Sequence, residues 1–194
     1  LAEIAARRGE AELAARYARH AGLLREGINA RLWIEERGYY GQFLYGRDTL
    51  LLSPRSETLG EALCILWDIA PAERAVRVVE QVPSLDFGTP CFFPSIPDVQ
   101  PYHNDAVWPF VQAYWTLAAA RTGNEPNVLH GIGAIWRAGL LFLTNQENFV
   151  SWSGDRYGTQ INSANMLWSL SGNLALTYLS LIHISEPTRH SLIS

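Results

Sequence analysis

Apolar residues recur at helical intervals along most of this chain. Between residues 103 and 122 they follow one another at spacings of three and four, which places them on one face of a helix. Similar spacing extends over other segments, and hardly any stretch alternates as a half-buried strand does. We therefore predict an all-α fold, with helices over residues 2–36 (broken near Gly9), 58–69, 71–81, 103–122, 124–144 and 162–178.

Glycine, proline and polar residues mark the ends of these helices. Gly38 and Gly123 stand where a helix stop is expected, and Pro71 stands at a first helical position. Thr58 and Glu61 have the spacing of a capping box. Glycine, proline and capping residues thus set the predicted ends of the helices.

Two longer segments between the predicted helices have the character of loops. Residues 82–101 contain half of the ten prolines, which suits a loop that holds one shape. Residues 145–160 are polar, rich in glycine and aromatic residues, and without a period. The other connections are short, so antiparallel αα-hairpins are predicted over 58–81 and 103–144.

The composition fits one packed domain and excludes several classes of function. Of the 194 residues, 48% are apolar and 11% are aromatic. The net charge is −4 and lysine is absent, so no nucleic-acid-binding face is expected, and no apolar run is long enough to span a membrane. Cys64 and Cys91 lack the spacing of a metal site. We expect Cys64 to be a buried thiol, leave a disulfide open, and expect no metal and no cofactor.

A polar cluster stands at the predicted start of the 103–122 helix. Tyr102, His103, Asn104 and Asp105 are followed closely by Trp108. Asn or Asp at this place can cap a helix, which is one explanation. Hydrogen-bonding groups beside an indole also suit a sugar, which has hydroxyls and an apolar ring face. Both interpretations stay open on the residues alone.

The run Tyr102-His-Asn-Asp-Ala-Val-Trp-Pro109 resembles the Tyr-His-Asn-Gly-x-x-Trp-Pro motif of amylo-α-1,6-glucosidases (glycogen debranching enzymes) and related six-hairpin glycosidases. Asp105 stands where those enzymes usually have glycine. The resemblance implies a glycoside hydrolase with an (α/α)6 barrel. Because that barrel needs twelve helices, the helices predicted here correspond to about half of it, the C-terminal part. The N-terminal half of the same polypeptide is then the expected partner, and this chain alone is expected to be inactive.

Other segments carry the same resemblance. Gly46-Arg-Asp-Thr49 resembles a tetrapeptide of debranching enzymes, which makes Arg47 an implied sugar contact. A polar loop with Glu147 near its start, followed by a helix containing Trp168-Ser169, resembles the segment in which these enzymes carry the catalytic base. Glu147 is therefore the implied base; the alternative is that it only binds nearby backbone.

The resemblance also implies an inverting mechanism, in which a base activates water and a second carboxyl group protonates the leaving oxygen. It places this general acid upstream of Leu1, and Asp105 is the candidate within the chain. Asp155 is a further carboxylate expected to face the pocket. The implied pocket wall consists of Tyr102, His103, Asn104, Trp108 and Trp168.

These inferences assign residues 1–178 to a partial glycosidase domain. Residues 179–194 resemble a translated sequencing-library adapter and are set aside from the fold. One alternative function is a glycan-binding (α/α) module without catalysis. Another is an (α/α)-toroid polysaccharide lyase with Tyr102 and His103 as acid and base. A helical-repeat scaffold ranks last, because the chain has no fixed-period repeat.

Overall fold

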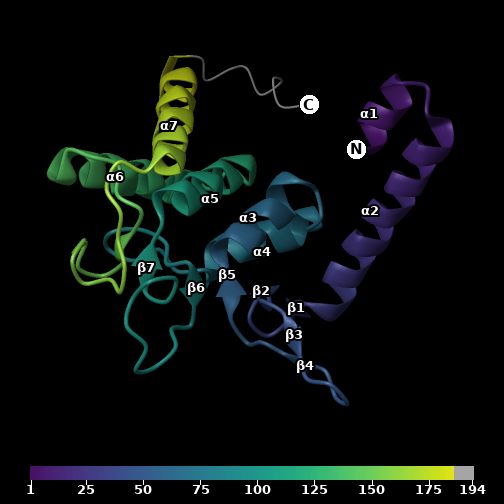
Figure 1. Cartoon of the computed structure of the whole chain (residues 1–194), viewed down its shortest axis with the longest axis horizontal. Coiled ribbons are helices and arrows are strands. Elements are labelled where there is room, and N and C mark those ends of the chain that lie inside the picture. Colours follow the sequence, from purple (N-terminus) through teal and green to yellow (C-terminus); the bar gives the residue numbers. More distant parts are fainter. Residues whose placement is uncertain (186–194) are drawn as a thin grey trace.

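The computed structural model describes residues 1–185, with side chains through residue 178. About half of the chain is helical (Figure 1). The helices of this part are α1 (Ala2–Arg7), α2 (Ala11–Arg31), α3 (Thr58–Leu66), α4 (Ala72–Gln81), α5 (Pro109–Arg121), α6 (Glu125–Phe142) and α7 (Leu167–Ser185). The strands are β1 (Trp33–Ile34), β2 (Tyr39–Tyr40), β3 (Leu44–Tyr45), β4 (Leu51–Leu52), β5 (Ser56–Glu57), β6 (Phe92–Phe93), β7 (Ala106–Val107) and β8 (Phe149–Val150).

The strands form antiparallel pairs, which the hydrophobic pattern does not predict. β1 pairs with β2, β3 with β4, β5 with β6, and β7 with β8. Two residues are too few for an alternating pattern to show. The described part of the chain is therefore α-rich with short strand pairs, and the prediction of an all-α fold was wrong in this respect.

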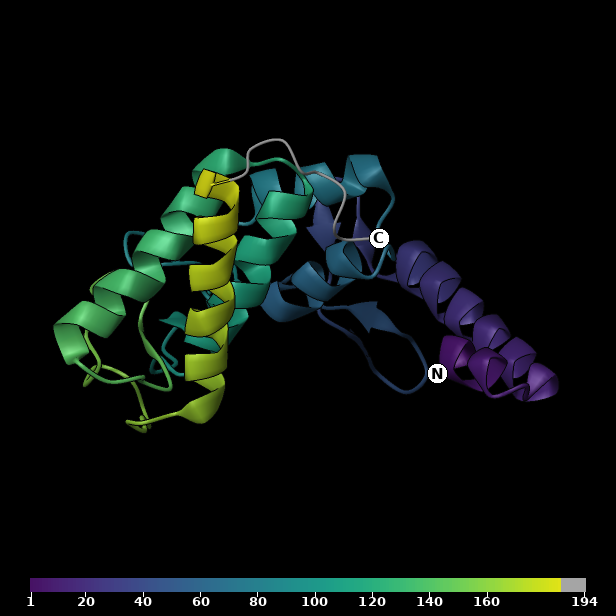
Figure 2. The ribbon, with the colours of Figure 1, turned by 90° about the horizontal axis from the view of Figure 1, so that it is seen from above.

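Helix α5 is at the centre of the helix packing. It lies against α3, α6 and α7 (Figure 2). Trp115 is completely buried, in a cluster that includes Ile65 of α3 and Val78 of α4. A Cβ atom on Gly131 of α6 would lie 2.0 Å from Oγ1 of Thr116, so glycine is what allows α5 and α6 to approach this closely. Because neighbours surround it, α5 is buried on more than the one face that its sequence predicts.

Two helices begin later than predicted. α5 begins at Pro109 with Trp108 as its N-cap, and α7 begins at Leu167. Asn104, one of the possible caps, and Asn162, at the predicted start of the last helix, bind the backbone of loops with their side-chain amides. They hold loops in place rather than opening helices.

The predicted capping box at the start of α3 was also wrong. The cap is Glu57, whose carboxylate accepts a hydrogen bond from the N–H of Gly60 at 2.7 Å. Thr58 instead donates to a loop carbonyl, and Glu61 accepts the N–H of Tyr40 at 2.8 Å. Glu61 therefore joins α3 to β2.

The glycine predictions are confirmed in two of three cases. Gly9 (φ +77°) separates α1 from α2, and Gly123 (φ +73°) follows α5. The helix predicted to end near Gly38 ends at Arg31 instead. Gly38 (φ +70°) lies in the turn between β1 and β2, where the left-handed backbone also favours glycine.

Helix α7 extends beyond residue 178, the predicted end of the domain. Its backbone continues to Ser185, through the first part of the segment that resembles an adapter. Residues 186–194 of that segment lie outside the described residues.

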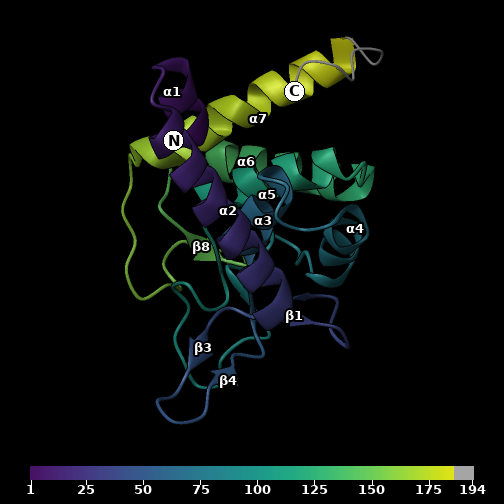
Figure 3. The ribbon, with the colours of Figure 1, turned by 90° about the vertical axis from the view of Figure 1, so that its right-hand side faces the viewer.

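Helices α1 and α2 form a hairpin that stands away from the other helices (Figure 2, and Figure 3 from the α2 side). No residue of α2 is buried. Near the end of α2, Asn29 ties the hairpin to the rest: its Nδ2 donates to the carbonyl of Ile69 and its Oδ1 accepts from the hydroxyl of Tyr40, each at 2.7 Å. The hairpin is thus attached at one end.

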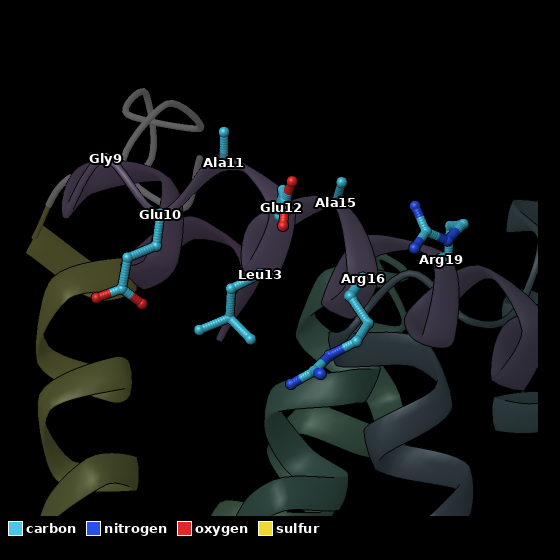
Figure 4. A pocket seen from close by; sticks show the side chains of 8 residues that line it. All are labelled: Gly9, Glu10, Ala11, Glu12, Leu13, Ala15, Arg16 and Arg19. Atoms are coloured by element: carbon cyan, nitrogen blue, oxygen red, sulfur yellow. The ribbon is translucent and has the colours of Figure 1, made fainter.

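One hollow lies at the free end of this hairpin and is open. It measures about 890 Å³ and is lined only by residues between Gly9 and Arg19. Figure 4 shows Leu13 and Arg16 on one side of the helix, with Ala11 and Ala15 on the other. A hollow lined by a single segment has no opposite wall, so it does not enclose a ligand as a binding pocket does.

Candidate functional site

The loop before α5 is folded around Asn104, which is 3% exposed. Its Oδ1 accepts the N–H of Ile96 at 2.7 Å, and its Nδ2 donates to the carbonyls of Ile96 and Val99 at 3.1 Å each. Buried amides need such partners, and this one fixes the loop at several points. The structure places Asn104 beneath the loop, with its amide engaged by the backbone.

Aromatic rings gather beside this loop. His103 stacks on Trp108, with ring centroids 4.8 Å apart and planes at 21°, and Tyr102 meets Trp108 edge-on at 5.1 Å. Trp168 of α7 lies 5.8 Å from Trp108 and stacks on Phe110 at 4.5 Å. We call these five residues the ring cluster. It brings together four of the residues predicted to form the pocket wall.

Exposure within the ring cluster is uneven. Trp108 is 4% exposed, and its Nε1 donates to the carbonyl of Tyr102 at 2.7 Å. Trp168 is 44% exposed, and His103 is exposed as well. Solvent therefore reaches Trp168 and His103, while Trp108 is buried in contact with both rings.

Glu147 lies against the ring cluster. The hydroxyl of Tyr102 donates to Oε1 of Glu147 at 3.2 Å, and Glu147 is 8% exposed. The β7–β8 pair brings the two segments together, with Val107 opposite Phe149. Burial, and then the negative charge of Glu147, raise the pKa of the Tyr102 hydroxyl, so it stays protonated and keeps this hydrogen bond.

The backbone around Glu147 is held by α7 and by the segment that leads into it. The carbonyl of Gln146 accepts from the hydroxyl of Ser169 at 2.9 Å, and the N–H of Glu147 donates to the carbonyl of Ser163 at 2.8 Å. The next residue, Asn148, is completely buried. These contacts fix the backbone at Glu147, and the Tyr102 hydroxyl holds its carboxylate.

Asp105 has a left-handed backbone, with φ +54°. Glycine adopts this conformation without strain and aspartate tolerates it, which is a physical reason for the glycine in the motif that this segment resembles. The backbone carbonyl of Asp105 accepts from the hydroxyl and the N–H of Ser151 at 2.8 and 2.9 Å. Burial raises the pKa of the Asp105 carboxyl, and hydrogen bonds from Asn104 and Ser95 oppose the rise.

Arg47 and Asp155 are not connected to the ring cluster. Arg47 is exposed in the turn of the projecting β3–β4 hairpin (Figure 1). Asp155 is exposed, and its Oδ1 accepts the N–H of Tyr157 at 2.8 Å. Within the described part of the chain, no hydrogen bond or ion pair joins either residue to Glu147 or to the rings.

Glu57 is a carboxylate beside the ring cluster that was not among the predicted site residues. It lies opposite Phe92 in the β5–β6 pair, and the Phe92 ring is 6.2 Å from that of His103. Burial raises the pKa of Glu57, while hydrogen bonds from the α3 backbone and the charge of His103 lower it. Its place depends on β5–β6, for which the sequence carries no signal.

No protein-family model and no curated protein matches this chain. Over the described residues, no three His, Cys, Asp or Glu side chains are grouped to hold a metal ion, and no helix has the length and apolar character to cross a membrane. Cys64 and Cys91 are buried free thiols. Any assignment of function therefore depends on the geometry of Glu147 and the ring cluster.

Proposed function

We propose that this chain is part of the catalytic barrel of a glycoside hydrolase acting on an oligo- or polysaccharide. The observation that carries the proposal is the hydrogen bond from Tyr102 to Glu147, which sets a mostly buried carboxylate against the ring cluster. Carbohydrate sites combine such polar groups with aromatic faces.

The proposed architecture is about half of an (α/α)6 toroid. It is supported by the neighbouring helix pairs α3–α4 and α5–α6. Helix α6 also exposes Trp136, Leu140 and Leu141, at 47%, 75% and 65%. Exposed apolar residues on one helix are expected where further helices of a barrel cover it.

In the proposed reaction Glu147 is the general base. A sugar ring rests on the exposed face of Trp168, and a water molecule lies between its anomeric carbon and Glu147. The carboxylate takes a proton from this water as its oxygen attacks, and the bond to the leaving oxygen breaks with inversion. Because Tyr102 binds Oε1, the other oxygen of Glu147 is the one that accepts the proton.

The leaving oxygen needs a proton from a second carboxyl group. Asp105 and Glu57 border the ring cluster, and burial raises the pKa of both, as a general acid requires. Asp105 is hydrogen-bonded within its own loop, and Glu57 caps α3. Asp105→Asn and Glu57→Gln would distinguish them. The variant that lacks the general acid should lose most of its rate on substrates with poor leaving groups, because these need a proton on the leaving oxygen.

The second candidate is a glycan-binding module without catalysis. It is favoured by the hydrogen bonds that hold the Asp105 carboxylate to Asn104 and Ser95. In this case Trp168 and His103 would bind a sugar in the same way, but Glu147 would only orient it.

The test is hydrolysis of malto- and isomalto-oligosaccharides by this chain together with the proposed N-terminal half of the barrel, measured as release of reducing ends, because the chain alone is expected to be inactive. Glu147→Gln should lower the rate by about 10²–10⁴-fold while sugar binding is retained, and Glu36→Gln, at an exposed site, should change neither. Binding without hydrolysis when both halves of the proposed barrel are present would favour the glycan-binding module, and an unsaturated product would indicate a lyase. An unchanged rate in Glu147→Gln would end the proposal that Glu147 is the base.

A further inference from the structure

Contacts between aromatic rings continue beyond the ring cluster along α5. Trp108 meets Trp168, Trp168 stacks on Phe110, and Phe110 in turn meets Tyr114 edge-on, with ring centroids 6.3 Å apart. We call Trp108, Trp168, Phe110 and Tyr114 the aromatic row. Tyr114 was not among the predicted site residues, because it lies at a position of α5 whose spacing predicts a core residue.

Tyr114 is exposed on a helix that is otherwise mostly covered. From Pro109 to Ala120, the other side chains of α5 are buried or half-buried, whereas Tyr114 is 42% exposed. A single exposed tyrosine is ordinary on a protein surface. This one differs because its ring continues a series of rings that leads to a mostly buried carboxylate.

The exposed rings of the aromatic row are close to each other. Trp168 and Tyr114 are exposed to a similar degree, and the half-buried ring of Phe110 contacts both of them. Phe110 and Tyr114 are four residues apart, which is about 6 Å along a helix. This rise is similar to the length of one sugar unit in an extended oligosaccharide, so the two exposed rings can contact neighbouring units of one chain.

The order of contacts gives this chain of sugars a direction. The proposed base Glu147 binds Tyr102, which meets Trp108 at the start of the aromatic row, and Tyr114 is at the other end. A sugar unit on Trp168 is therefore nearer to the bond that is cleaved, and a unit on Tyr114 is farther from it. Contacts so far from the reacting atoms supply binding energy for the substrate.

We propose that Tyr114 forms a second sugar-binding position, so that the site selects oligosaccharides over single sugar units. The phenol ring offers a face for the apolar side of a pyranose, and its hydroxyl can exchange hydrogen bonds with the hydroxyls of the sugar. This inference rests on the proposed function, because it takes Trp168 as the first sugar-binding position.

The test compares sugars of different length. Methyl α-glucoside is the one-unit probe, and maltotriose and isomaltotriose are the three-unit probes. Each is titrated into the chain, and tryptophan fluorescence gives the dissociation constant. At least one trisaccharide should bind about tenfold more tightly than the glucoside, because it gains the contact with Tyr114.

Substitutions at Tyr114 assign the difference. Tyr114→Ala should weaken binding of that trisaccharide about tenfold and leave the glucoside unchanged, whereas Tyr114→Phe, which keeps the ring, should retain most of the affinity. Tyr178→Ala removes another exposed tyrosine (66%), about 15 Å along α7 from Trp168, and should change neither. Circular dichroism checks that each variant is folded.

Two results would overturn the second position while leaving the ring cluster as a sugar site. One is equal affinity of the unsubstituted chain for the glucoside and both trisaccharides, which needs no variant. The other is an unchanged trisaccharide affinity in Tyr114→Ala when Trp168→Ala has lost it. Absence of saturable binding of any of these sugars would instead contradict both the second position and the proposed function.

Discussion

The close contact between α5 and α6 leads to a sharp stability prediction for Gly131→Ala. The added Cβ would lie 2.0 Å from Oγ1 of Thr116 and 3.0 Å from Nε2 of Gln112. Thr116 cannot turn aside freely, because its Oγ1 donates to the carbonyl of Gln112 at 2.8 Å. Gln112 is also fixed, since its Oε1 accepts the N–H of Thr89 at 2.7 Å. The new methyl group must therefore push the two helices apart or break this buried network.

The expected magnitude follows from two costs and one gain. Overpacking a core position costs about 1–3 kcal/mol, and loss of the Thr116 hydrogen bond costs about 1 kcal/mol more. Alanine recovers about 1 kcal/mol of helix propensity over glycine. We expect Gly131→Ala to lower the free energy of unfolding by about 1–3 kcal/mol.

Gly133→Ala, in the same helix, is the matched control. A Cβ on Gly133 has no atom within 4 Å, so only the gain in helix propensity remains, up to about 1 kcal/mol. Urea denaturation followed by circular dichroism measures both variants, and Thr116→Ala combined with Gly131→Ala should recover part of the loss. Equal stability of Gly131→Ala and Gly133→Ala would refute the α5–α6 contact described here.

The buried acids and thiols make further predictions. Burial raises the folded-state pKa of Glu61 above its ordinary 4.5. The free energy of unfolding should therefore fall as pH rises from about 4.5 toward the folded-state pKa. Denaturation at a series of pH values should show a smaller fall in Glu61→Gln and an unchanged fall in Glu36→Gln. Cys64, whose pKa burial raises to about 12, should resist a thiol reagent at pH 7 until the chain is unfolded in denaturant; rapid labelling of the folded chain would contradict its burial. Asn162→Ala removes three hydrogen bonds, at 2.7, 2.8 and 3.4 Å, that tie residues 148 and 156 together. It should lower stability by about 1–3 kcal/mol in thermal denaturation, and a loss below about 0.5 kcal/mol, as at an ordinary surface position, would argue against this clamp.

The helices of this fold were predictable because their spacing repeats over many residues. The break between α1 and α2 at Gly9 and the end of α5 just before Gly123 were predictable, because glycine tolerates a positive φ. The strand pairs were not predictable, since each strand has two residues and β5–β6 joins distant parts of the chain. The starts of α5 and α7 were placed too early, because Asn104 and Asn162 are residue types that often cap helices but here bind loop backbone.

The candidate site was predictable only in part. The motif placed Tyr102, His103 and Trp108 together, and the polar loop indicated Glu147, but their contact depends on the β7–β8 pair. No pattern distinguishes a buried indole such as Trp108 from the exposed one of Trp168 before the packing is known.

The central claim is that the ring cluster binds a sugar through Trp168, and tryptophan fluorescence tests it most directly. Titration with malto- and isomalto-oligosaccharides should change the fluorescence of the unsubstituted chain in a saturable manner. Trp67→Ala, which removes another exposed indole (63%) after the end of α3, should keep this response, and Trp168→Ala should abolish it. A saturable response that survives in Trp168→Ala would contradict the account.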